Sequence, residues 1–138
     1  MTILADAAAT DGQYDLVACA WLPGLEIPLH MHTRYAEAVY LEEGELTIYT
    51  PGNTRVLHAG EYARIPPATP HAIVITSKTT SKGLTIASPS GFAQLIEAVG
   101  VEGKSPGVRP DAPPDMALFL KASAEVGDVL LGPPGSRP

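Results

Sequence analysis

The sequence lacks the features of several protein classes. Its 138 residues include a single cysteine, Cys19, so no intrachain disulfide can form. This agrees with a reducing compartment, and Cys19 is predicted to be a small buried residue of a strand. No apolar run approaches the roughly 20 residues of a membrane-spanning helix. The first ten residues also lack the basic segment and long apolar stretch of a signal peptide. We therefore expect a cytoplasmic protein with no membrane partner.

Positive charge is also scarce. Lys and Arg together number 9 against 15 Asp and Glu, which gives a formal net charge of −6. The basic residues are scattered and form no stripe that could neutralise phosphates, so we expect no nucleic acid partner. The length fits one domain, and a hydrophobic content of 45% is enough for one core.

Helical periodicity is missing before residue 91, and turn residues are frequent instead. The chain holds 13 glycines and 14 prolines, and between them lie short runs typical of strands. Strands are predicted over residues 14–21, 27–32, 36–41, 46–49, 55–58, 62–65, 72–76 and 83–87. Such spacing favours an all-β fold, an antiparallel barrel or sandwich. We expect a loose N-terminal arm (1–13), a barrel domain (14–90) and a C-terminal helical extension (91–138).

The extension carries two apolar stripes of helical spacing. The first covers residues 92–99 and is followed by Gly100, a suitable C-terminal stop. The second begins after Asp115, a suitable N-cap, and ends at Gly127. Between them, the Pro- and Gly-rich residues 101–114 are predicted to form a connecting loop. We expect both helices to cover an open face or end of the barrel.

Three of the four histidines form a pattern with one glutamate. His30 and His32 are separated by one residue, and side chains two apart on a strand point to the same face. Glu37 lies on the next predicted strand, and His71 begins a later one. Three imidazoles and one carboxylate in one volume suit a divalent transition metal. The fourth histidine, His58, lies outside this pattern, and we expect it to face solvent.

Apolar residues share the strand faces of these candidate ligands. They are predicted to line a substrate pocket beside the metal, and they are Val39 and Leu41 after Glu37, and Ile73 and Ile75 after His71. Tyr35, near the ligands, and Tyr62 and Arg64, which share a strand face, are further candidates for substrate contacts. An outward-facing strand surface is an alternative for all three residues.

The spacing of these residues resembles the first motif of the cupin superfamily. The pattern G-x5-H-x-H-x4-E-x6-G extends from Gly24 to Gly44 with every fixed position present. The resemblance covers about residues 14–87. It implies a small β-barrel of the jelly-roll type, with the metal bound inside by the residues His30, His32, Glu37 and His71.

The second cupin motif, G-x5-P-x-G-x2-H-x3-N, is matched in part. Gly60, Pro66 and His71 agree with it, whereas Ala68 stands at the third glycine position and Ile75 at the asparagine position. If a positive φ is needed at that glycine, Ala68 is strained. Ile75 is expected to make the pocket wall more apolar. Neither departure removes a metal ligand.

Within this superfamily, the single barrel, the short segment 45–59 and the two-helix tail resemble small bacterial quercetin 2,3-dioxygenase-like proteins. The tail ending at residues 128–134 (D-V-L-L-G-P-P) is similar to such proteins too. Cupins host enzymes of several classes and binding proteins, so the fold alone does not choose a reaction. By analogy with other cupins, we expect a homodimer.

Three functions remain open from the sequence. The first is a metal-dependent dioxygenase of a small enol or aromatic, quercetin-like substrate, in which Glu37 acts as both metal ligand and proton acceptor. The second is a non-redox cyclase or isomerase of polyketide-like molecules, in which the metal polarises a carbonyl. The third is a non-catalytic small-molecule-binding module. The ligand set admits Fe, Ni, Mn, Co, Cu or Zn.

Overall fold

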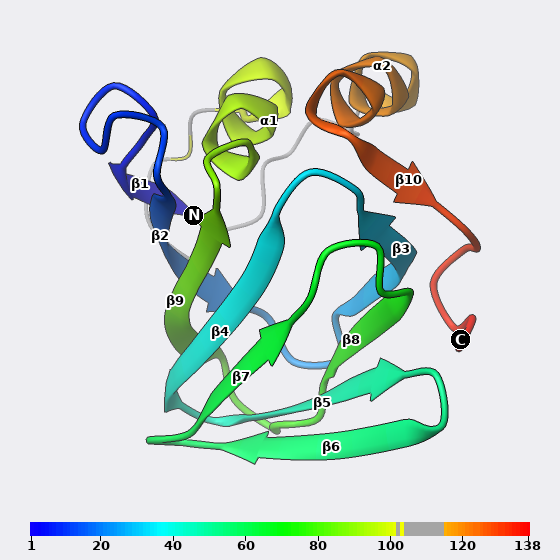
Figure 1. The fold of residues 1–138 in the computed structure, drawn as a ribbon. Helices are drawn as coiled ribbons and strands as arrows, with labels where there is room; N and C mark the ends of the chain where they lie inside the picture. The colour runs from blue at the N-terminus through cyan, green and yellow to red at the C-terminus, as the bar shows by residue number, and fades with distance from the viewer. Residues whose placement is uncertain (102, 104–114) are drawn as a thin grey trace.

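The computed structural model describes residues 1–101, 103 and 115–138, and strands make up more of this part of the chain than helices do. The strands form two five-stranded sheets in which every pairing is antiparallel (Figure 1). In the first sheet the order is β1 (Thr2–Ala5), β2 (Asp15–Trp21), β9 (Ser81–Ser88), β4 (Ala36–Glu43) and β7 (Tyr62–Ile65). In the second sheet it is β10 (Asp128–Leu130), β3 (Glu26–His32), β8 (His71–Ile75), β5 (Glu45–Thr50) and β6 (Asn53–His58).

This architecture confirms the predicted fold, an antiparallel jelly roll with two C-terminal helices. The alternation of buried and exposed side chains along the strands explains how the two sheets pack against each other. Along β2, buried positions alternate with partly exposed ones from Asp15 to Trp21, so one face of the strand enters the core. The core lies between the two sheets and takes side chains from both. Its buried members are Val17, Cys19, Trp21, Val39, Leu41, Leu46, Ile48, Leu57, Ala63, Ile65, Ile73 and Ile75.

The first helix, α1 (Phe92–Val99), begins and ends as the apolar stripe predicts. Its N-terminal amides are satisfied by another strand, because Asp15 Oδ2 on β2 accepts hydrogen bonds from Gly91 N at 2.8 Å and Ala93 N at 3.0 Å. A buried carboxylate at a helix N-terminus also complements the helix dipole. Asp15 therefore ties α1 to the first sheet.

The second helix, α2 (Met116–Val126), has the predicted caps. Asp115 Oδ1 accepts a hydrogen bond from Leu118 N at 3.0 Å, and Gly127 ends the helix in the left-handed region with φ 86°. The two helices lie side by side at one end of the sheets (Figure 1) and pack through Leu95, Ala122 and Val126. The predicted connecting loop, 101–114, lies outside the described residues except for positions 101 and 103.

The ends of the chain are more closely joined to the sheets than the sequence suggested. The arm was expected to be loose, yet its residues Thr2–Ala5 pair with β2 as the edge strand β1. After α2, β10 pairs with β3 and so adds a strand to the second sheet. The division into arm, barrel and extension stays a prediction about folding units. No helix among the described residues is long and apolar enough to cross a membrane.

Candidate metal centre

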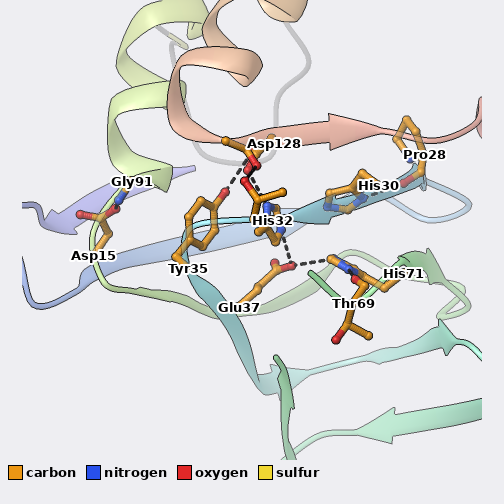
Figure 2. A network of polar contacts seen from close by, with 12 residues as sticks. Asp15, Pro28, His30, His32, Tyr35, Glu37, Thr69, His71, Gly91 and Asp128 are labelled. Carbon is orange, nitrogen blue, oxygen red and sulfur yellow. Dashed lines mark hydrogen bonds and ion pairs between the residues drawn. The ribbon is translucent and has the colours of Figure 1, made fainter. Parts of the chain in front are cut away.

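The four predicted ligands come together where the two sheets meet the helices. His30 and His32 lie on β3, and His71 begins β8, whose register sets it directly opposite His30. Glu37 reaches the same point from β4 of the other sheet. One donor atom from each residue lies within 4.8 Å of all the others. Figure 2 shows dashed contacts from His32 and from His71 that meet at the carboxylate of Glu37.

Backbone and side-chain acceptors fix the orientation of each imidazole. His30 Nδ1 lies 2.8 Å from Pro28 O, and His71 Nδ1 lies 2.9 Å from Thr69 O. Because a carbonyl oxygen only accepts, each Nδ1 carries the hydrogen and donates it. In the neutral ring this leaves the lone pair on Nε2, the atom that faces the cluster in His71. The two tautomers are therefore set for metal binding.

His32 is held by a side chain that the sequence analysis did not select. Its Nδ1 lies 2.6 Å from Oδ1 of Asp128, the first residue of β10, and the register of β10 sets Asp128 opposite His32. The second oxygen, Asp128 Oδ2, accepts a hydrogen bond from Tyr35 Oη at 3.0 Å. The Tyr35 ring stacks on the His32 ring at 4.4 Å between centroids. Asp128 thus orients a ligand without belonging to the cluster. In the sequence, only its position at the start of the D-V-L-L-G-P-P segment pointed to Asp128.

The chemistry of the donors fits a divalent cation. Glu37 Oε2 lies 3.2 Å from His32 Nε2 and 3.1 Å from His71 Nε2. The side chains of His71, His32 and Glu37 are 0%, 6% and 12% exposed. Three imidazole lone pairs and a carboxylate converge here, and a divalent ion would satisfy all of them, leaving a formal charge near +1. The neighbouring carboxylate of Asp128 would offset that remaining charge.

In the metal-free protein the cluster shares protons unevenly. Burial lowers the pKa of His30 to about 4, and the neighbouring His71 ring adds to this effect. Burial also lowers the pKa of His32, but hydrogen bonds to Asp128 and Glu37 outweigh it and raise this pKa to about 9. Burial would raise the pKa of Glu37, yet the close contacts of its carboxylate with the His32 and His71 rings hold this pKa well below its usual range. Glu37 is therefore ionised near pH 7, and the proton it attracts lies on His32.

A cavity of about 210 Å³ opens beside these ligands. His30, His32 and Glu37 form part of its wall, and the helices form another part through Phe92 and Phe119. The remaining lining residues are mostly apolar and come from both sheets, the helices and the N-terminus: Met1, Trp21, Leu25, Ile27, Pro28, Ile73, Leu95, Ser123, Asp128 and Leu130. The cavity is smaller than the roughly 300–1,000 Å³ of pockets for drug-sized ligands.

The predicted pocket residues occupy different places. Ile73 lines the cavity. Val39, Leu41 and Ile75 do not, because they fill the closed core between the sheets. The prediction for these three was wrong for one reason. They share strand faces with the ligands, but they lie farther along the strands, where facing side chains leave no space. Ile75 therefore makes the core, and not the cavity wall, more apolar.

The predicted polar contacts need the same correction. Tyr35 is 1% exposed and lies behind His32, where it contacts Asp128 and is not among the residues that line the cavity. Tyr62 and Arg64 are exposed because they alternate along β7 with the buried Ala63 and Ile65. They therefore face solvent, as the outward-facing alternative predicted. His58 is also exposed, as predicted, and lies 3.4 Å from Glu45.

Comparison with known proteins agrees with this geometry. The cupin domain profile matches residues 19–87, which is half of the chain and includes all four ligands. The chain belongs to the cupin domain family. This cupin is 30% identical over 99 residues to quercetin 2,3-dioxygenase from Bacillus subtilis, an alignment that covers 72% of this chain and 29% of that protein. The chain thus spans less than a third of the length of the curated relative it matches.

Solved structures agree with the fold of this cupin. An oxalate oxidase in complex with the substrate analogue glycolate is 27% identical, with a TM-score of 0.54, and the match covers 64% of this chain and 49% of that one. The structure of KdgF from Halomonas sp. is 23% identical, with a TM-score of 0.57, and covers 64% of this chain and 76% of that one. The second likeness concerns the fold alone.

Proposed function

We propose that this cupin is a metal-dependent dioxygenase of a small enol or aromatic molecule of the quercetin type. One observation carries the proposal: the cluster of three imidazoles and one carboxylate opens directly onto a cavity with a mostly apolar wall. Four protein ligands leave one or two positions of a transition metal open. The likeness to a quercetin 2,3-dioxygenase supports this choice of reaction.

His30, His32, Glu37 and His71 would hold the metal. A bound divalent ion supplies a Lewis-acidic centre, and a redox-active one also supplies electrons for reaction with O2. The apolar wall excludes water from the substrate, and the aromatic rings of Trp21 and Phe92 offer surfaces for a planar ligand. These features favour a substrate with an acidic enol or catechol oxygen on an aromatic body.

Glu37 is the residue that we assign to proton transfer. Its pKa is held below the usual range, so the carboxylate is unprotonated at neutral pH, which is the state that a proton acceptor requires. Oε2 is the atom that both His32 and His71 approach. The second oxygen, Oε1, is the one we assign to the substrate hydroxyl. Deprotonating an enol there makes the substrate more electron-rich and more reactive toward O2.

Oxygen uptake tests this proposal. Protein loaded separately with iron, nickel, manganese or cobalt is mixed with quercetin and a panel of smaller enols and catechols, and dissolved O2 is recorded. We expect uptake that depends on substrate and disappears in Glu37→Gln. The same mixtures under nitrogen test the non-redox alternative. Conversion of substrate without O2, or no uptake with any metal and substrate, contradicts the dioxygenase.

The non-redox alternative has lost part of its basis. Tyr62 and Arg64, the predicted substrate contacts that could have bound a polyketide-like molecule, face solvent on β7. The cavity wall that remains is mostly apolar. We therefore propose only the dioxygenase.

A further inference from the structure

One polar side chain of the cavity wall has no partner. Ser123 lies on α2, is 1% exposed and lines the cavity. Its Oγ is one of four buried side-chain atoms, among the described residues, without a hydrogen-bond partner. The other three are Asp15 Oδ1, Glu26 Oε2 and Ser90 Oγ, and none of their residues lines this cavity. A buried hydroxyl without a partner is unfavourable, so this one needs an explanation.

The described residues around Ser123 provide its hydroxyl with no hydrogen-bond partner. Phe119, one helical turn before it, also lines the cavity, and Leu95 of α1 does the same. Asp128 lines the cavity too, and its two oxygens contact His32 and Tyr35 but accept no hydrogen bond from Ser123. The Ser123 hydroxyl therefore lies on the helical part of the cavity wall, whereas the metal-binding cluster lies on strands. A ligand in the cavity is the partner that this position suits.

We propose that Ser123 recognises a second polar group of the ligand, remote from the group that binds the metal. The inference rests on the proposed function and narrows its substrate class. The ligand is an aromatic molecule with an enol or catechol at one end and a further hydroxyl or carbonyl farther along its body. A serine hydroxyl both donates and accepts, so either group fits. Ser123 acts as a specificity-determining residue and takes no part in bond making.

We expect the site to discriminate strongly between a ligand with the remote hydroxyl and an analogue without it. A site that hydrogen-bonds a ligand hydroxyl rejects the analogue without it, because a buried polar group is then left without a partner. For one neutral hydrogen bond in an apolar cavity, we expect a preference of about tenfold. Replacing Ser123 by alanine removes this preference and leaves the apolar and metal contacts in place.

Trp21 provides the probe for this test. It is the chain's single tryptophan and lines the cavity, so ligands that enter are expected to quench its fluorescence. The protein is loaded with zinc, which has no redox chemistry, so binding is measured without turnover. Two matched ligand pairs are titrated: 4-(hydroxymethyl)catechol against 4-ethylcatechol, and 3,4′-dihydroxyflavone against 3-hydroxyflavone. In the first pair a remote hydroxyl is replaced by a methyl group, and in the second it is replaced by hydrogen.

We expect wild-type protein to bind the hydroxylated member of at least one pair about tenfold more tightly, and Ser123→Ala to bind both members within about twofold of each other. Ser90→Ala, which removes a buried hydroxyl without a partner outside this cavity, is the matched control and keeps the wild-type preference. A merely structural role of Ser123 would change the unfolding temperature but not this ratio.

Two results overturn the inference: the same ratio in wild type and Ser123→Ala for both pairs, or no quenching by any of the four ligands. Oxygen uptake does not enter this test. A serine-dependent preference without oxygen uptake by the iron-loaded protein would therefore refute the dioxygenase and keep the ligand class. Oxygen uptake without a serine-dependent preference would keep the dioxygenase and refute the role of Ser123.

Discussion

Nδ1 of His32 lies 2.6 Å from Oδ1 of Asp128, and this contact joins a predicted metal ligand to a residue 96 positions later in the chain. Asp128 follows directly after Gly127, the residue that ends α2. Thr33 donates two hydrogen bonds to Gly127 O, from N at 2.9 Å and from Oγ1 at 2.7 Å. The helix that forms part of the cavity wall and the orientation of His32 therefore depend on the same short segment (Figure 2).

Asp128→Asn is expected to weaken metal binding by about 10- to 100-fold, because partners that orient a ligating histidine contribute at this level. An amide places no charge beside the His32 ring and binds its Nδ1 hydrogen less strongly. The measurement is competition with a chelator of known affinity above pH 9, where the His32 proton no longer competes with the metal. Tyr35→Phe, which removes the other hydrogen bond of Asp128, is the control and should lose much less affinity. Equal affinity of Asp128→Asn and wild type would refute this role.

Metal affinity should rise with pH up to about 9. In the metal-free protein His32 has a raised pKa of about 9, so it holds a proton that a metal must displace from Nε2. Because one proton is released on binding, the apparent metal affinity should increase about tenfold for each pH unit from 7 to 9. Above pH 9 it should stay constant. Chelator competition at several pH values measures the slope. A metal affinity that does not change between pH 7 and 9 would show that His32 does not hold this proton.

The same pKa has a consequence for the metal-free fold. Because the folded pKa of His32 lies above its ordinary value of 6.5, the protonated ring stabilises the protein fully below pH 6.5. This contribution is lost as the pH rises through about 9. Metal-free Asp128→Asn should therefore show a smaller fall in unfolding temperature than wild type between pH 6.5 and 9. If the unfolding temperature of Asp128→Asn falls as much as that of the wild type, Asp128 does not raise the pKa of His32.

Gly127→Ala should destabilise the protein by about 2 kcal/mol or more. Gly127 has φ +86°, and a Cβ built there would lie 2.7 Å from Thr33 Oγ1 and from Arg34 Cγ. The backbone strain and the clash both contribute. Gly52→Ala is the matched control, since Gly52 also has a positive φ (+70°) but open space around it, and about 1 kcal/mol is expected there. Urea unfolding compares the two. Equal losses would show that the Thr33 contact is unimportant.

The sequence predicted the ligands because strand alternation depends only on neighbouring positions. His30 and His32 share a face for that reason, and the motif placed Glu37 and His71 beside them. Asp128 and Ser123 could not be found in the same way. Each becomes important only when α2 and β10 return to the second sheet, and no local pattern encodes that contact.

The pocket predictions failed for a related reason. Period-two reasoning tells which face of a strand a residue occupies, but not where along the strand the interior opens. Glu37 and Leu41 share the inner face of β4, yet only Glu37 reaches the cavity, near the start of the strand. The depth of the cavity depends on how α1 and α2 cover the end of the sheets, and that is a tertiary property.

Ala68 is a place where the sequence prediction was specific and confirmed. The second cupin motif has glycine there, and Ala68 has φ 56°, in the left-handed region. Its amide donates to His32 O at 2.7 Å, so the turn is fixed next to the metal ligands. Ala68→Gly should stabilise the protein by about 0.5–1 kcal/mol, the relief of strain less the added entropy of glycine. Lower stability in urea unfolding would show that Ala68 is not strained.

We expect His30, His32, Glu37 and His71 together to hold one metal ion, which metal analysis of the purified protein measures. After incubation with a divalent metal and removal of the excess, the wild type should retain about one ion per chain, and His71→Ala, which removes a fully buried ligand, less than a tenth of that. His58→Ala, which removes the exposed histidine outside the cluster, should match the wild type. Equal metal content in all three proteins would contradict the account.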